Sequence, residues 1–265
     1  MKIMKKRLKY TLIAVGVILI GAAIVLGILY ACRPNMVRRW FGRTQAVAMV
    51  YVDRLKGKPY TKDGFDGIDV SKHNGVIKWK EVAKNKRVKY VFIKATEGKG
   101  YIDPLYRRNI RQARKAGLMV GSYHLLTSRS SATDQFLHFK SVVKKNEQDL
   151  IPVLDIEQKG IEKGLCCWKG RQLVDSVKVF AELVKKHYGK YPIIYTNEDY
   201  YNHELDAQLG KYILFIANYN RVPILDGKGK ANLWQYSEHG HLHGIGEYVD
   251  LSRLVNGTTV KDLML

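Results

Sequence analysis

Cysteine is scarce in this chain, with three residues among 265. Two of them, Cys166 and Cys167, are adjacent, and neighbouring cysteines rarely form a disulfide because the small ring strains the peptide bond between them. The sequence also lacks the C-x-x-C spacing of many metal sites. We therefore expect no disulfide framework, no bound metal and no cofactor, and we expect the two adjacent thiols to be packed.

Acidic residues are also few, because 24 Asp and Glu stand against 45 Lys and Arg, giving a net charge of +21. A strongly basic surface attracts polyanions such as nucleic acid, anionic lipid or an acidic cell wall. The basic residues are scattered rather than gathered in one helix, and no nucleic-acid-binding motif is present. We therefore expect no nucleic-acid partner. Wall polymers and lipid headgroups stay open as partners, and so does a merely solvated surface.

Charge is absent from residues 11–31, an apolar run long enough to cross a membrane as a helix, which takes about 20 residues. The run exceeds the core of a typical secretory signal, which favours a retained anchor. Residues 1–10 are rich in Lys and Arg and are expected to stay in the cytoplasm, which places the remainder of the chain outside. Residues 29–32 loosely resemble a lipoprotein cleavage site, so a lipid-modified Cys32 is the alternative. Both interpretations predict a membrane-tethered protein.

Residues 32–62 mix apolar side chains with arginine, which is typical of an amphipathic stem near a membrane. From residue 63 to 265, apolar β-branched runs alternate with helical patterns, which favours a parallel sheet. Strands are expected at residues 65–70, 89–95, 118–125, 151–157, 193–197, 212–219, 231–236 and 248–251. Helices are expected at residues 79–86, 104–116, 131–145 and 168–188. Eight strands with few helices toward the end predict an irregular α/β barrel preceded by one transmembrane helix.

The most informative motif is residues 150–157 (LIPVLDIE), an apolar run with two acids at alternate positions. On a strand, residues i and i+2 point to the same face with Cα atoms about 6.6 Å apart, so Asp155 and Glu157 would lie side by side. Such a pair suits cleavage of a glycosidic bond, with one carboxyl protonated for the leaving oxygen and the other charged. The alternative is structural, with acids that cap a helix or pair with a lysine.

Polar residues follow the other predicted strands, and the C-terminal strand ends of a β/α barrel carry its chemistry. Two further acids stand there, Asp69 and Asp250. The other candidates at strand ends are Lys94, Glu97, Tyr123, His124, Tyr195, Trp234 and Tyr236. A mouth lined by carboxylates and aromatic rings suits sugar binding, because rings stack on pyranose faces and acids bind hydroxyls. Some of these residues have structural alternatives, namely a supporting Lys94–Glu97 ion pair and a buried, hydrogen-bonded His124. The alternating histidines at 239, 241 and 243 are expected in a mobile loop rather than at a metal.

Seven ordered blocks occur over residues 65–252: GIDVS at 67–71, FIKATEG at 92–98, GSYH at 121–124, PVLDIE at 152–157, PIIYT at 192–196, LWQY at 233–236 and VD at 249–250. This order resembles glycoside hydrolase family 25, the muramidases of phage lysins, bacteria and some fungi. The resemblance implies a TIM-like (β/α)5(β)3 barrel. It also implies hydrolysis of the β-1,4 bond between N-acetylmuramic acid and N-acetylglucosamine in peptidoglycan glycan strands.

Carried over by position, the resemblance implies that Glu157 is the general acid and that Asp155 positions the substrate acetamido group or stabilises developing charge. Asp69 and Asp250 match the other two carboxylates. Three positions depart from the family pattern: Leu125 stands where an aromatic residue is usual, Phe215 where Trp is often found, and Ser252 where Asn is usual. We expect a monomer. A chitinase-like hydrolase remains an alternative, although those enzymes usually carry a longer acidic series before the D-x-E pair. A non-catalytic wall-binding module is another, but would be expected to have lost a carboxylate.

Overall fold

The computed structural model describes residues 64–162, 168–205, 207–226 and 229–265. The predicted cytoplasmic flank, transmembrane anchor and stem (residues 1–10, 11–31 and 32–62) lie outside these ranges, as do the three cysteines. Those expectations therefore stay predictions. Within the described part of the chain, no helix combines the length and the apolar character needed to cross a membrane.

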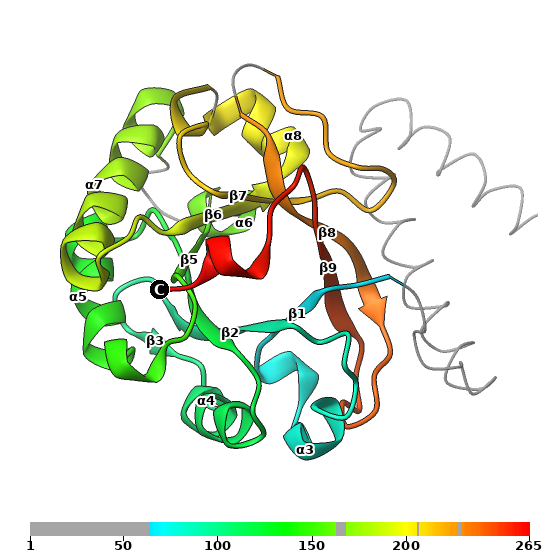
Figure 1. Cartoon of the computed structure of the whole chain (residues 1–265). Helices are drawn as coiled ribbons and strands as arrows, with labels where there is room; N and C mark the ends of the chain where they lie inside the picture. Colours follow the sequence, from blue (N-terminus) through cyan, green and yellow to red (C-terminus); the bar gives the residue numbers. More distant parts are fainter. Residues whose placement is uncertain (1–63, 163–167, 206, 227–228) are drawn as a thin grey trace, which may run out of the picture. The chain divides into compact units, whose positions relative to one another are not determined.

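Eight strands close into a barrel with helices packed around it (Figure 1). The barrel strands are β1 (Gly67–Val70), β2 (Tyr90–Glu97), β4 (Val120–Leu125), β5 (Val153–Asp155), β6 (Ile193–Asn197), β7 (Leu214–Ala217), β8 (Ala231–Gly240) and β9 (Val249–Leu254). Neighbours are parallel from β1 through β8, whereas β9 is antiparallel to both β8 and β1 and completes the ring. A ninth strand, β3 (Tyr101–Ile102), extends β2 outside the ring.

The helices follow the early strands and bury one face each. They are α3 (Trp79–Val82), α4 (Tyr106–Lys115), α5 (Ala132–Val142), α6 (Gln158–Glu162), α7 (Gly170–Tyr188) and α8 (Glu198–Tyr200). In α4 the buried residues Tyr106, Asn109, Ile110 and Ala113 recur at helical spacing, so this face packs inward. Helix α5 begins where the Ser131 side chain accepts a hydrogen bond from a backbone N–H of the first turn.

The predicted α/β barrel with eight strands is confirmed, and the described residues between β7 and β8 and between β8 and β9 contain no helix. Several expected elements are shorter in the structure, most clearly the helix at 79–86 and the strands at 151–157 and 212–219. The helix expected at 79–86 is the single turn of α3, because the chain must turn back for the Lys89 N–H to reach the Asp66 carbonyl at the start of β2. The strand expected at 151–157 stops at Asp155. Conversely, β8 extends to Gly240, so His239 lies in a strand rather than in a mobile loop.

The two ends of the barrel differ. We call the end where the parallel strands begin the base, and the end where they finish the mouth. Apolar side chains fill the interior toward the base, among them Phe92, Ile151 and Leu263. The C-terminal residues lie across this end (Figure 1), where the Ile151 N–H donates to the Leu263 carbonyl at 2.8 Å. The open polar space described below lies at the mouth.

Candidate active site

The four predicted acids meet around one cavity of about 160 Å³ at the barrel mouth. They come from three strand ends that are far apart in the sequence. The residues that line the cavity are Asp69, Phe92, Tyr123, Val153, Asp155, Glu157, Tyr195, Phe215, Tyr219, Gln235, Glu238 and Asp250. The parallel topology brings Asp69, Asp155 and Glu157 together, because residues at the ends of different parallel strands emerge at the same end of a barrel. Asp250 joins them because it stands near the start of β9, which is antiparallel.

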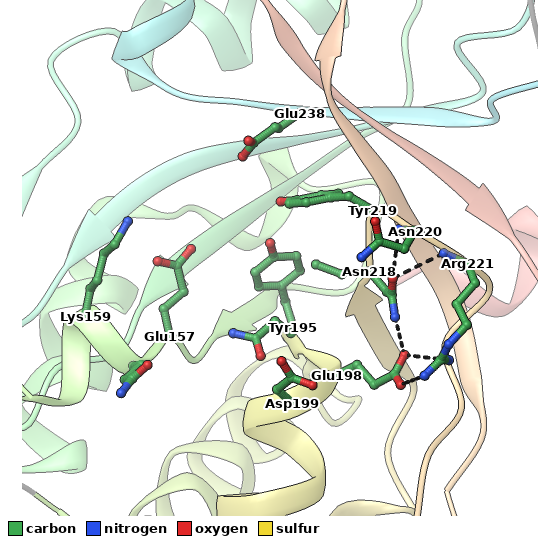
Figure 2. A pocket seen from close by; sticks show the side chains of 13 residues that line it. Glu157, Lys159, Tyr195, Glu198, Asp199, Asn218, Tyr219, Asn220, Arg221 and Glu238 are labelled. Atoms are coloured by element: carbon green, nitrogen blue, oxygen red, sulfur yellow. Dashed lines mark hydrogen bonds and ion pairs between the residues drawn. The ribbon is translucent and has the colours of Figure 1, made fainter. Parts of the chain in front are cut away.

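Asp155 and Glu157 do not share a strand, which corrects the expected geometry. The Asp155 carbonyl accepts from Leu126 N–H at 2.9 Å and the Ile156 N–H donates to the Tyr195 carbonyl, so Asp155 is fixed between the neighbouring strands. Glu157 instead precedes α6, and its carbonyl accepts the first helical hydrogen bonds of that helix. Both side chains still line the cavity. The Glu157 backbone therefore caps α6, as the structural alternative proposed. Its side chain does not take part in the cap and points into the open space at the mouth (Figure 2).

The Asp155 carboxyl is buried, with 7% of its surface exposed, and its Oδ1 has no hydrogen-bond partner among the described residues. Burial raises the pKa of Asp155 well above its ordinary value, and the nearby Glu157 charge raises it further, while Lys94 opposes the change. A carboxyl without donors in a desolvated position favours its neutral form. Burial therefore favours the neutral form of Asp155.

Asp69 and Asp250 face each other directly across the antiparallel β1–β9 pair, and their side chains are hydrogen-bonded. Two carboxylates cannot form that bond without a proton, so one proton is shared. Burial raises the pKa of Asp69 to about 6, although hydrogen bonds from Gln235 and Asp250 work in the other direction. Burial and then the Asp69 charge raise the pKa of Asp250 well above its ordinary value. Asp250 therefore keeps the proton and donates it to Asp69.

Gln235 organises the cavity wall, and it was not among the residues selected from the sequence. Its Nε2 donates to Asp69 Oδ2 at 3.0 Å. Its Oε1 accepts from the hydroxyls of Tyr195 and Tyr219 at 2.8 and 3.0 Å. This buried amide thus ties two tyrosines to one carboxylate, as satisfied buried polar groups do.

Trp234 and Tyr236 lie on the opposite face of β8, so the structure does not bring them to the cavity. Trp234 Nε1 donates to the Asn218 carbonyl at 2.7 Å. The Arg253 guanidinium lies over the Tyr236 ring at 4.5 Å. Because successive strand residues alternate between faces, Gln235 points inward where its two aromatic neighbours point outward.

The same alternation separates Tyr123 from His124. Tyr123 lines the cavity, and burial followed by the nearby acids raises its pKa well above 10. His124 is fully buried on the helix side, where Nδ1 lies 2.7 Å from Thr96 Oγ1 and the ring stacks on Phe180. Burial lowers the pKa of His124 to about 3, so this imidazole stays neutral. The structural alternative for His124 is the arrangement found.

Lys94 and Glu97 form the expected ion pair, with Nζ and Oε2 separated by 2.9 Å. Neither residue lines the cavity. The Lys94 charge nevertheless acts on Asp155, because it is the main influence that lowers the pKa of that carboxyl. The pair therefore supports the acids electrostatically from the side of β2.

A larger groove of about 560 Å³ adjoins the cavity and shares Glu157, Tyr195, Tyr219 and Glu238 with it. Figure 2 shows Glu157 and Glu238 on opposite sides of this space, with the two tyrosine rings near them. The other lining residues are Gln158, Lys159, Asn197, Glu198, Asp199, Ala217, Asn218, Asn220 and Arg221. A groove that opens from a closed cavity suits a polymer whose bond is cut at one point.

Buried Glu198 secures the groove wall. Arg221 Nη2 lies 2.6 Å from Glu198 Oε1, and the Asn218 amide donates to Glu198 Oε2 (Figure 2). These contacts hold residues 218–221, and with them the Tyr219 ring, against α8. These residues were not predicted from the sequence, because the strand expected at 212–219 ends at Ala217 and the segment after it has no hydrophobic periodicity.

Within the described ranges, no group of three or more His, Cys, Asp or Glu side chains is arranged to hold a metal ion. His239 instead packs edge-on against the Tyr248 ring, with centroids 5.3 Å apart. The chemistry that the site offers is that of carboxyl groups with different proton affinities.

Comparisons with known proteins point to one family. The sequence profile of Glycosyl hydrolases family 25 matches residues 68–245. The uncharacterized protein YegX of Escherichia coli K12 is 35% identical over 197 residues, which cover 72% of this chain and 70% of that protein. Lysozyme M1 of Streptomyces globisporus is 29% identical over 78% of this chain and 73% of its own length. A solved family 25 glycosyl hydrolase from Bacillus anthracis superposes with a TM-score of 0.69 at 29% identity, covering 78% of this chain and 97% of that one.

Proposed function

Because the chain belongs to glycoside hydrolase family 25 and is therefore a glycoside hydrolase, we propose that it hydrolyses the β-1,4 bond between N-acetylmuramic acid and N-acetylglucosamine in peptidoglycan. The observation that carries this proposal is the meeting of four carboxyl groups at one cavity that opens into a groove. The similarity to proteins named lysozymes supports this choice of substrate.

We assign the general acid to Glu157, because it alone among the four acids lines both the cavity and the groove. Glu157 gives its proton to the leaving oxygen as the bond to the anomeric carbon breaks. The resulting carboxylate takes a proton from the water that adds to that carbon.

Asp155 and Asp69 have different tasks in this scheme. The unpartnered Oδ1 of Asp155 accepts the N–H of the substrate acetamido group and fixes the sugar that is cut. Asp69 is the inner carboxylate that carries charge above pH 6 or so, and it accepts hydrogen bonds from Gln235 and Asp250. Since those donors engage its oxygens, Asp69 stabilises the developing positive charge electrostatically.

The test is digestion of purified peptidoglycan by the full-length protein, with mass analysis of the released ends. Reducing N-acetylmuramic acid ends are expected, and anhydro ends would instead indicate a lytic transglycosylase. Chitin incubated in parallel separates this activity from the chitinase-like alternative. Glu157→Gln is expected to abolish cleavage, whereas the matched control Glu182→Gln, on the exposed surface of α7, is expected to retain it. An active Glu157→Gln protein would remove Glu157 from the mechanism.

We also propose that residues 11–31 anchor the protein as a monomer in a membrane, with the barrel outside the cytoplasm and with a lipid-modified Cys32 as the alternative. The support is the length of the uncharged run and the basic residues before it. Anchoring would confine cutting to the wall layer next to the membrane. Cell fractionation tests this: activity found in the medium and none in membranes contradicts the proposal, and a mass increase lost in Cys32→Ala identifies the lipid form.

A further inference from the structure

The base of the barrel carries exposed basic side chains that no acid neutralises. They lie in the connections that lead into β2, β4, β5 and β6, which are neighbours in the ring. We call the following residues the basal surface: Lys86, Arg87, Lys115, Lys144, Lys145 and Lys186. All six are exposed, and none forms an ion pair with another described residue.

The acids of the same connections are already paired. Asp66 is bound to Lys89 at 2.5 Å, Glu147 to Arg107 at 3.0 Å and Asp149 to Arg114 at 3.4 Å. Exposed Asp262, in the C-terminal turn at this end, accepts hydrogen bonds from Thr259 and forms no ion pair with a described residue, so the six basic side chains leave the basal surface with an excess of positive charge. The basic residues that are scattered in the sequence are thus gathered by the fold at one end of the barrel.

A concavity of about 830 Å³ opens within this end, lined by Lys140, Lys144, Lys145 and His187 among others. The electrostatic potential in this concavity is positive. Burial lowers the pKa of His187, and the charges of Lys140 and Lys145 lower it further. The groove at the mouth is mixed in charge, because Lys159 and Arg221 line it together with Glu157, Glu198, Asp199 and Glu238. The base is therefore distinguished by its unpaired positive side chains, and not by an opposite charge at the mouth.

The chain enters the barrel at its base. The Asp66 N–H donates to the Ser252 carbonyl at 2.8 Å just before β1 begins. Gly64 lies against the Arg253 side chain, where an added Cβ would approach Nη2 to 2.8 Å. Residues 1–63, which include the apolar run 11–31, are thus joined to the charged end and not to the mouth.

We propose that the basal surface binds anionic phospholipid headgroups, so that the barrel lies with its base on the membrane and its mouth facing away. Positive side chains are attracted to an anionic leaflet within a Debye length, about 10 Å at 0.1 M salt. A lipid surface fits better than an anionic wall polymer because the apolar run of membrane-spanning length is joined to this end.

The consequence concerns access to substrate. With the base on the membrane, the groove faces the glycan strands beyond it, and the orientation comes from the field of the barrel itself. This inference rests on the proposed membrane location together with the charge and direction of the chain, and it holds or fails independently of the proposed hydrolysis.

Hydrogen–deuterium exchange of the full-length protein in lipid nanodiscs tests the orientation. Nanodiscs of phosphatidylcholine are compared with nanodiscs that also contain phosphatidylglycerol. Slower exchange of residues 84–89, 143–147 and 186–191 is expected only with phosphatidylglycerol, while residues 197–204 and 236–247 at the mouth exchange equally in both. Equal exchange of the basal residues in the two lipids, or protection of the mouth, would overturn the proposal.

Charge reversal provides the matched comparison. The triple variant Lys144→Glu, Lys145→Glu and Lys186→Glu is expected to lose the basal protection. A control triple variant at the mouth end, Lys72→Glu, Lys78→Glu and Lys99→Glu, is expected to keep it. Thermal melting and exchange without lipid confirm that both variants fold. Basal protection produced by a purified anionic wall polymer, and not by phosphatidylglycerol, would also overturn the proposal.

Should the chain not insert into nanodiscs, co-sedimentation with vesicles of the same two compositions gives the answer. Binding to phosphatidylglycerol vesicles that the basal triple variant loses, and that high salt removes, supports the proposal. Binding to neither kind of vesicle, or to both equally, refutes it.

Discussion

Replacing Asp69 with Asn is expected to stabilise the protein while it abolishes hydrolysis. Burial raises the pKa of Asp69 from 3.8 to about 6. A group with a raised folded pKa binds more protons folded than unfolded between these values, so the stability falls as pH rises from 3.8 to 6. At about 1.36 kcal/mol per pKa unit, the full cost is about 3 kcal/mol near neutral pH. Because Asp69 is partly exposed, this figure is an upper bound.

The measurement is denaturant unfolding of wild type and Asp69→Asn from pH 4 to neutral pH, with thermal melting as a second readout. For a domain of this size, about 3 kcal/mol corresponds to an increase in Tm of roughly 6–12 °C. The variant should show the largest gain at neutral pH and almost none at pH 4. Asp175→Asn, an exposed position on α7, is the control and should change stability little. A variant that is less stable than wild type at neutral pH, or that keeps the wild-type slope, would refute the reasoning.

Three further changes test the surroundings of the cavity. Tyr195→Phe removes one hydrogen bond to Gln235, which is expected to cost about 1 kcal/mol of folding free energy, to lower Tm by roughly 2–4 °C and to lower kcat/KM; an unaltered Tm and kcat/KM would contradict this. Arg221→Leu leaves Glu198 buried without its cation and is expected to destabilise the fold by about 2 kcal/mol at neutral pH. The stability of Arg221→Lys is expected to lie between those of wild type and Arg221→Leu. Equal stability of all three proteins in unfolding curves would show that this ion pair does not stabilise the groove wall. Burial lowers the pKa of His124 to about 3, so its contribution to stability is lost as pH falls from about 6.5 toward 3. A His124→Gln protein should lose that pH dependence of stability and keep its activity. A folded but inactive His124→Gln protein would place the imidazole in catalysis.

The strands and their order were readable from the sequence because each is an apolar run closed by polar residues. Asp69 and Asp155 each close such a run, and in a parallel barrel that position places a residue at the mouth. Asp250 reaches the mouth for a different reason, because it stands near the start of β9, which runs antiparallel to its neighbours. The convergence of these acids therefore needed no knowledge of side-chain packing.

The direction of individual side chains was not readable. Barrel strands are buried on both faces and appear as nearly continuous apolar runs, so the sequence does not show which parity points inward. For this reason Trp234 and Tyr236 were selected although Gln235 faces the cavity, and His124 was selected beside Tyr123. Asp250 faces inward opposite Asp69, so Ser252, two residues further along β9, shares that face. Gln235 pairs with Ser252 and therefore also faces inward, but this follows only once the register of β8 and β9 is known.

The distribution of charge follows from the same topological rule as the active site. Residues that follow a parallel strand reach the mouth, and residues that precede it reach the base. In this chain, acids such as Glu157 follow strands, whereas basic pairs such as Lys144 and Lys145 precede them. A sequence in which the basic residues are only scattered thus yields a barrel with an acidic cleft and a basic underside. Burial raises the pKa values of Asp155 and Asp250 at the mouth, which favours their neutral forms. The negative charge of the cleft is therefore smaller than its number of acids suggests, and an anionic glycan meets less repulsion there.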